Sequence, residues 1–229
     1  MGKLSALRRL VTYGGRALRG KAVSVIVAGL VALPVQAETT ILAFGDSLTQ
    51  GYGLPAEEGF VPQLEAWLRD RGHEVTLVNG GVSGDTTRGG LARVDWSLRP
   101  EIDAMIVALG GNDVLRGLDP VESRRNLDGI LAAGQAKGVE MLVIGLSAAQ
   151  NYGADYKQAF DAMYPELAES YGALYEPNFF AGLMGENGDP SESLRFMQPD
   201  GIHPAAEGVA RIVEQVGPRV EELIERVGD

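Results

Sequence analysis

Short apolar runs of strand length alternate along this sequence with segments that have the apolar spacing of helices. This alternation restricts the fold more than any other feature. The apolar runs are Ile41–Phe44, Val75–Val78, Ala104–Leu109, Met141–Leu146 and Ala173–Tyr175. Strands that alternate with helices form βαβ units, which build parallel sheets with helices on both faces. We therefore predict an α/β fold: a flavodoxin-like, three-layer αβα sandwich around a five-stranded parallel sheet.

Between the predicted strands, apolar residues recur every three or four positions, as they do along one face of an amphipathic helix. The stripes are Phe60, Leu64, Trp67 and Leu68; Leu127, Ile130 and Leu131; Phe160, Met163, Tyr164 and Leu167; and Val209, Ile212, Val213, Val216, Val220 and Leu223. Gly217-Pro218 interrupts the last stripe. A kink or break is expected there, because proline lacks the N–H that a helix interior requires.

Residues 1–37 differ in composition from the rest of the chain. They include six Lys or Arg residues and no Asp or Glu, with an apolar run over residues 22–33 and the ending Pro34-Val35-Gln36-Ala37. A basic start, a short apolar run and a small-residue ending are typical of a secretory signal peptide. The apolar run is shorter than the roughly 20 residues of a membrane-spanning helix. We predict cleavage after Ala37, a periplasmic or secreted location, and no membrane anchor after cleavage.

The composition of the remaining chain, 38–229, excludes several classes of function. The whole chain has a formal charge of −11, but residues 38–229 carry 14 basic and 31 acidic residues, a charge of −17. This charge argues against nucleic acid as a partner, because phosphate binding requires a basic surface. The chain has no cysteine, which excludes disulfides, thiolate metal sites and a cysteine nucleophile. We expect one domain, a monomer, and neither metal nor cofactor.

Polar loops follow three of the predicted strands, at the carboxyl ends where parallel sheets bind ligands. These loops are Gly45–Thr49, Asn79–Asp85 and Gly110–Asp113, and Asp200–Pro204 precedes the last helix. A serine hydroxyl becomes a nucleophile when a base takes its proton. His203 is the obvious base for Ser47, and Asp200 is close enough to orient it. Glycine-flanked turns and the Asn112 amide can supply the donors that an oxyanion needs.

Each of these residues also has a purely structural interpretation. Asp46-Ser47 can be only a helix N-cap, His203 can cap the last helix, and Gly110–Asp113 can be a tight turn. The other histidine, His73, lies in a polar turn, and we expect it to be a solvated surface residue.

Together these segments resemble the four sequence blocks of the GDSL, or SGNH, hydrolase family, in the family's order. The blocks are Gly45-Asp46-Ser47-Leu48, Gly84, Gly111-Asn112-Asp113 and Asp200-x-x-His203. Other segments resemble the branch of secreted arylesterases, thioesterase I and lysophospholipase L1. They are Gly51-Tyr52-Gly53, Leu115-Arg116-Gly117 and Asn151-Tyr152-Gly153. The resemblance covers essentially all of residues 38–229, although the stretch Phe180–Phe196 is longer and more polar than expected for the branch.

The resemblance implies an ester hydrolase with the three-layer fold. It makes Ser47 the nucleophile, His203 the base and Asp200 the acid that orients it, with Ser47, Gly84 and Asn112 as the oxyanion donors. The substrate-binding residues that it implies are Asp46, Leu115, Asn151, Tyr152 and Ile202. Segment 114–120 is expected to help bind the acyl chain. The expected substrates are small or lipid-like: aryl and short- to medium-chain acyl esters, extending to thioesters and lysophospholipids.

Other functions stay open at this stage. An acyltransferase would use the same acyl-enzyme, and a binding module could use this fold without catalysis. Gly145–Ala149 approximates the G-x-S-x-G elbow of α/β-hydrolases, with Ser147 as nucleophile, but Ala149 replaces the last glycine. Gly51–Ala56 weakly matches a dinucleotide-binding pattern, but it begins six residues after Gly45 and contains Pro55.

Overall fold

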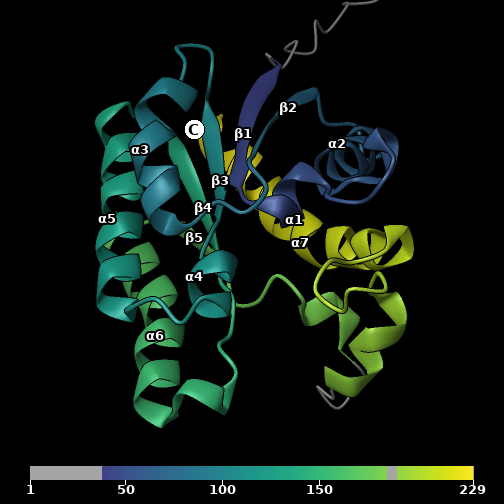
Figure 1. Cartoon of the computed structure of the whole chain (residues 1–229). Helices are drawn as coiled ribbons and strands as arrows, with labels where there is room; N and C mark the ends of the chain where they lie inside the picture. Colours follow the sequence, from purple (N-terminus) through teal and green to yellow (C-terminus); the bar gives the residue numbers. More distant parts are fainter. Residues whose placement is uncertain (1–37, 185–189, 229) are drawn as a thin grey trace, which may run out of the picture. The chain divides into compact units, whose positions relative to one another are not determined.

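The computed structural model describes residues 38–184 and 190–228, and they are built around a parallel sheet (Figure 1). The strands are β1 Thr39–Gly45, β2 Val75–Gly81, β3 Ala104–Ala108, β4 Glu140–Ile144 and β5 Leu174–Glu176. Their order across the sheet is β2-β1-β3-β4-β5, and every pairing is parallel. This is the flavodoxin-like order, so the predicted fold class is confirmed. The predicted signal peptide, residues 1–37, lies outside the described residues.

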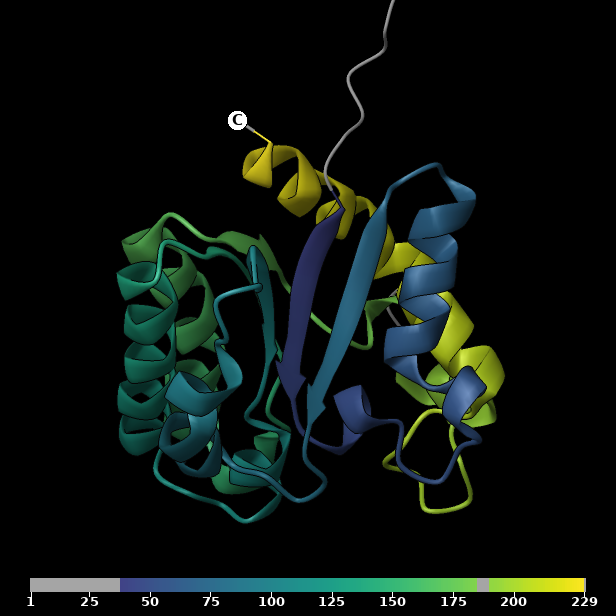
Figure 2. The same ribbon diagram turned by 90° about the horizontal axis from the view of Figure 1, so that it is seen from above.

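Helices cover both faces of the sheet, as Figures 1 and 2 show. One face carries α3 (Thr87–Ser97), α5 (Pro120–Ala136) and α6 (Ala154–Tyr171), and the other carries α2 (Phe60–Asp70) and α7 (Ala206–Val227). The short helices are α1 (Ser47–Gln50), α4 (Gly111–Leu115) and the 3-10 turns η1 (Ala56–Glu58), η2 (Gln150–Tyr152), η3 (Ala181–Leu183) and η4 (Pro190–Phe196). No helix of the described residues is long and apolar enough to cross a membrane.

The apolar stripes predicted from the sequence are buried against the sheet, which confirms α2, α5, α6 and α7. Phe60, Leu64 and Leu68 of α2, for example, are at most 1% exposed. All five residues of β3 are buried, as expected for a central strand covered on both faces. Helix α3 was not predicted, because it buries no regular apolar stripe. Its buried residues are Thr87, Gly90 and Val94.

Two local predictions are corrected by the structure. Helix α7 continues through Gly217 and Pro218, so of the expected kink or break, the break does not occur. At Gly217 a Cβ atom would lie 2.5 Å from the Trp67 ring, so the glycine lets α7 pack closely on α2, and this packing accompanies the unbroken helix. Strand β2 extends beyond Val78 to Gly81, because residues 79–81 continue the pairing with β1.

The topology places a binding crevice at a defined point. From β1 the chain forms β2 on one side and then crosses to β3 on the other side of β1. Connections therefore diverge beyond the carboxyl ends of β1 and β3, and open α/β sheets bind ligands at such a switch point. Helices α1 and α4 begin there, at Ser47 and Gly111.

Candidate active site

A serine and a histidine that are far apart in the sequence form, with an aspartate three residues before the histidine, a continuous hydrogen-bonded chain at this crevice. Ser47 Oγ lies 2.8 Å from His203 Nε2, and His203 Nδ1 lies 2.7 Å from Asp200 Oδ2. The other carboxylate oxygen of Asp200 accepts the backbone N–H groups of Ile202 and His203, at 2.9 and 3.0 Å. The structure thus brings together the residues that the sequence suggested as nucleophile, base and orienting acid.

The surroundings of Asp200 keep this residue ionised. Hydrogen bonds from the His203 ring and from the backbone N–H groups of His203 and Ile202 lower the pKa of Asp200 to about 2. Asp200 is therefore a carboxylate at neutral pH. That is the form that can accept the Nδ1–H of a histidine and stabilise an imidazolium.

The loop that carries Asp200 and His203 is held by the residues before it. Gln198 N–H donates to His203 O at 2.7 Å, and Met197 pairs with Pro204 in an antiparallel bridge. The Gln198 side chain donates to Tyr52 O at 2.8 Å, and the Tyr52 ring lies 4.6 Å from the His203 ring, centroid to centroid. These contacts fix the imidazole beside the start of α1.

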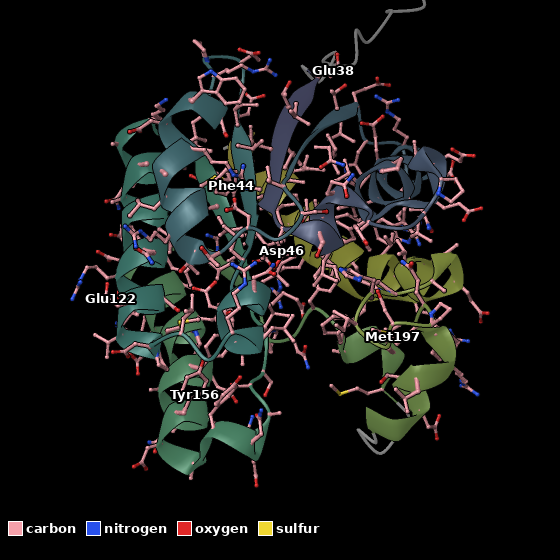
Figure 3. All side chains as sticks on the ribbon, viewed as in Figure 1. Glu38, Phe44, Asp46, Glu122, Tyr156 and Met197 are labelled. Carbon is pink, nitrogen blue, oxygen red and sulfur yellow. The ribbon has the colours of Figure 1, made fainter. Side chains whose placement is uncertain are left out.

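Asp46 has the structural role that its position suggested, because it caps α1. Its Oδ1 accepts the N–H of Leu48 at 3.0 Å, and its Oδ2 accepts from the Asn112 amide at 3.4 Å. The residue is 1% exposed, and Figure 3 shows it close to the carboxyl end of β1, below Phe44. Burial raises the pKa of Asp46 to about 6, although the hydrogen bonds from Leu48 and Asn112 oppose this shift.

We expect Asp46 to make folding stability depend on pH. Its pKa is about 6 in the fold against an ordinary value of 3.8, so the folded state binds the proton more tightly. The stabilisation that the protonated Asp46 contributes is fully present below about pH 4 and is lost as the pH rises through 6. A shift of about two units corresponds to roughly 3 kcal/mol. Urea unfolding at pH 4 and pH 7 should show a free energy that falls with pH more steeply in the wild type than in Asp46→Asn. Equal pH dependence in the two proteins would contradict this role.

The three expected oxyanion donors lie around one cleft. Asn112 is the second residue of α4, directly after β3, and Gly84 lies in the loop after β2. Gly84 has a φ of +78°, a left-handed conformation that favours glycine. Ser47 begins α1, where backbone N–H groups have no partner within the helix. All three residues line the same cleft.

A buried carboxylate, Asp113, holds α4 in place. It is 1% exposed and accepts the Thr87 N–H at 2.9 Å, the Thr87 hydroxyl at 2.6 Å and the Ser123 hydroxyl at 2.9 Å. These bonds join α4 to the first turns of α3 and α5. Asp113 therefore fixes α4, the helix that carries Asn112, and its carboxylate is bonded to Thr87 and Ser123.

Arg93 of α3 joins the ends of the first two strands. Its guanidinium donates to the carbonyls of Gly45 and Gly80, each at 2.9 Å, and to Asp85 at 2.7 Å. It also stacks over the Phe44 ring, 4.0 Å from the centroid. The loops that bear Ser47 and Gly84 are thereby fixed to each other. The sequence contained no signal for this role.

The cleft has a volume of about 460 Å³, and its walls are largely apolar. The apolar residues that line it are Leu48, Val114, Leu115, Leu146, Phe180, Met184 and Ile202. Of the expected substrate-binding residues, Asp46, Leu115 and Ile202 lie here. Phe180 and Met184 were missed as lining residues. Both lie at the start of the stretch Phe180–Phe196, which was expected to differ from the branch. Residues 185–189 of this stretch lie outside the described part.

Asn151 and Tyr152 are not among the described residues that line the cleft, which differs from their expected place. The Tyr152 hydroxyl lies 3.5 Å from Leu115 O. Its ring packs against Gly117, where a Cβ atom would lie 2.8 Å from the ring. The structure thus places Tyr152 in contact with the segment 114–120.

The two rival motifs lack the surroundings that their chemistry needs. Ser147 lines the cleft, but its hydroxyl donates to Asp161 at 3.0 Å and lies 2.6 Å from Lys157 Nζ. The histidine that this motif would need, His203, contacts Ser47 and not Ser147. Gly51 ends α1 with a φ of +87° and opens no helix, contrary to a dinucleotide-binding turn.

His73 is not the solvated surface residue that we expected. Its Nε2 lies 3.0 Å from Glu221 Oε1, with the histidine side chain 23% exposed. It therefore joins the end of α2 to α7. Among the described residues, no group of three or more His, Asp or Glu side chains is placed to hold a metal ion.

A parallel αβα sandwich with a serine–histidine–aspartate chain at its switch point has the arrangement of a serine hydrolase. The sequence pattern of the GDSL-like Lipase/Acylhydrolase family matches residues 43–211. The chain belongs to this family.

Known proteins resemble this chain over most of their length. Esterase TesA of Pseudomonas aeruginosa is 38% identical over 197 residues, which cover 85% of this chain and 94% of that protein. Thioesterase 1/protease 1/lysophospholipase L1 of Escherichia coli K12 is 32% identical over 197 residues, or 85% of this chain and 89% of that protein. The crystal structure of AlinE4, an SGNH-hydrolase family esterase, has a TM-score of 0.65 and 41% identity, covering 81% of this chain and 96% of that one.

Proposed function

We propose that the protein is a serine esterase in which Ser47 attacks the carbonyl carbon of a carboxylic ester. The observation that carries this proposal is the chain of contacts from Ser47 to His203 to Asp200, 2.8 and 2.7 Å long, at the floor of an open cleft. Membership of the acylhydrolase family and relatives named as esterases support the same reaction.

In the proposed mechanism, His203 Nε2 takes the Ser47 proton while Oγ bonds to the carbonyl carbon. The carbonyl oxygen becomes an oxyanion, which the N–H groups of Ser47 and Gly84 and the Asn112 amide stabilise. The tetrahedral intermediate collapses as the ester C–O bond breaks, and His203 gives its proton to the leaving alcohol. His203 then deprotonates a water molecule, whose oxygen bonds to the acyl carbon. The bond between Ser47 Oγ and the acyl carbon breaks as His203 returns the proton to Ser47 Oγ, which releases the acid and restores the free enzyme.

The apolar walls of the cleft support substrates with a hydrocarbon acyl or aryl group. We propose aryl and short- to medium-chain acyl esters as substrates. The Escherichia coli relative is named as a thioesterase and a lysophospholipase, so thioesters and lysophospholipids belong to the substrates to be tested. Acyl transfer to an alcohol would use the same acyl-enzyme and differs only in the final acceptor.

Rates on p-nitrophenyl esters of increasing acyl length, with a lysophospholipid and an acyl-CoA in parallel, test this proposal. Each CH₂ buried in the apolar cleft is worth about 0.8 kcal/mol, so kcat/KM should rise up to about fourfold per CH₂ until the chain fills the cleft. Adding an alcohol and analysing the products separates hydrolysis from acyl transfer. No turnover of any ester, together with no labelling of Ser47 by a fluorophosphonate, would favour a binding module instead.

We also propose that residues 1–37 are an export signal and that residues 38–229 act as a single exported domain, as a monomer. Support comes from the contrast between the basic, acid-free segment 1–37 and the acidic remainder. N-terminal sequencing of the exported protein tests the cleavage site and should begin at Glu38.

A further inference from the structure

One side chain outside the serine–histidine–aspartate chain contacts two of the proposed oxyanion donors. Arg116 follows α4 as its C-cap. Its Nη2 donates to Gly84 O at 2.9 Å and lies 3.5 Å from Asn112 Oδ1. Gly84 lies in the loop after β2, whereas Asn112 lies in α4, which follows β3. Arg116 therefore joins the two segments that follow β2 and β3.

The contact with Arg116 distinguishes the two ends of the Asn112 amide. A guanidinium group only donates hydrogen bonds, so it faces the amide oxygen. The amide nitrogen faces Asp46 Oδ2 at 3.4 Å. In the reverse orientation, the amide NH₂ would meet the guanidinium and the amide oxygen would meet the Asp46 carboxyl. One N–H of the observed amide is used toward Asp46, and the second is left for the cleft that Asn112 lines.

The charge of Arg116 is not neutralised locally. Among the described residues, no carboxylate lies within 4.0 Å of its guanidinium nitrogens. A cation beside two oxyanion donors favours the negative charge that develops on the carbonyl oxygen. Arg116 is exposed, so solvent screens this charge, but the charge still acts on the transition state more than on the neutral ester.

We propose that Arg116 is a positioning residue for the oxyanion hole. It fixes the Gly84 loop and the Asn112 amide in the orientation in which both donors face the reacting carbonyl oxygen. The inference rests on the proposed esterase function and adds to it a residue that touches neither the nucleophile nor the base.

Steady-state kinetics of Arg116→Gln and Arg116→Lys on a p-nitrophenyl ester test this role. Arg116→Gln should lower kcat by about tenfold to a hundredfold and change KM by less than about threefold. Arg116→Lys should fall between, because lysine keeps the charge without the planar fork of donors. Arg125→Gln is the matched control, since Arg125 is an exposed arginine paired with Glu122 on α5, and it should behave as the wild type.

A double-mutant cycle separates positioning from a general structural effect. Asn112→Ala alone should cost about 10²–10³ in kcat. In that background Arg116→Gln should cost clearly less than it does in the wild type, because the amide that it orients is absent while the contact with Gly84 remains. An unchanged kcat in Arg116→Gln, or equal losses in both backgrounds, overturns the positioning role. So does a loss of kcat that is accompanied by a matching rise in KM and a lower melting temperature. If Asn112→Ala itself is unimpaired while Ser47 still reacts with a fluorophosphonate, the oxyanion assignment fails together with the role of Arg116.

Discussion

Replacing Ser47 with alanine is expected to lower kcat on p-nitrophenyl esters by about 10⁴- to 10⁶-fold without unfolding the protein. The acyl-enzyme forms on Ser47 Oγ, and alanine offers no atom that can carry the acyl group. The hydroxyl contacts His203 at 2.8 Å and lies in a cleft. Removing it therefore leaves no buried polar group without a hydrogen-bond partner. The fold should therefore be unaffected, which circular dichroism and the melting temperature check.

Ser147→Ala is the matched control for this experiment. Ser147 lines the same cleft, but its hydroxyl is engaged by Asp161 and Lys157, so we expect kcat within about threefold of the wild type. A fluorophosphonate should label the wild type and Ser147→Ala and leave Ser47→Ala unlabelled. If Ser47→Ala kept more than a few per cent of the activity, the nucleophile would be a different residue.

The sequence pattern predicted the helices that bury one regular apolar face and the strands that are short, continuous apolar runs. The stripes of α2, α5, α6 and α7 are buried, and so are the apolar residues of the strand runs except for the partly buried ends at Val78, Ala173 and Tyr175. Helix α3 was not predicted, because it contacts the core through Gly90 and Val94 and has no large apolar stripe. At Pro218 the helix is not broken, and next to it Gly217 permits close packing against Trp67.

The central part of the site was predictable because its residues lie in short blocks with recognisable spacing. Its support was not, because Arg93 and Asp113 act through contacts between segments that are distant in the sequence. The residues that form the cleft walls could not be predicted for the same reason. Phe180 and Met184 line the cleft, yet no local pattern marks them, since their role depends on where the chain goes after β5. The resemblance implied that Tyr152 binds substrate, whereas its contacts in the structure are with Leu115 and Gly117 of segment 114–120.

Replacing Asp200 with asparagine is expected to lower kcat by about 10⁴-fold, although the two side chains have nearly the same shape. Asp200 Oδ1 accepts two backbone N–H groups, from Ile202 and His203. The asparagine oxygen must take that place, because an amide nitrogen cannot accept these bonds. The NH₂ group then faces His203 Nδ1, where the carboxylate stood 2.7 Å away.

This arrangement would hold His203 in the wrong tautomer. Facing a donor, Nδ1 becomes the acceptor and the proton moves to Nε2, which then cannot take the proton of Ser47. Since the pKa of Asp200 is about 2, its charge is constant at neutral pH, so the comparison at pH 7–8 reports the tautomer and the lost negative charge. Kinetics on a p-nitrophenyl ester should show the loss in kcat with KM nearly unchanged, while Asp70→Asn, an exposed aspartate at the end of α2, behaves as the wild type. An Asp200→Asn enzyme within tenfold of the wild-type kcat would show that Asp200 does not set the state of His203.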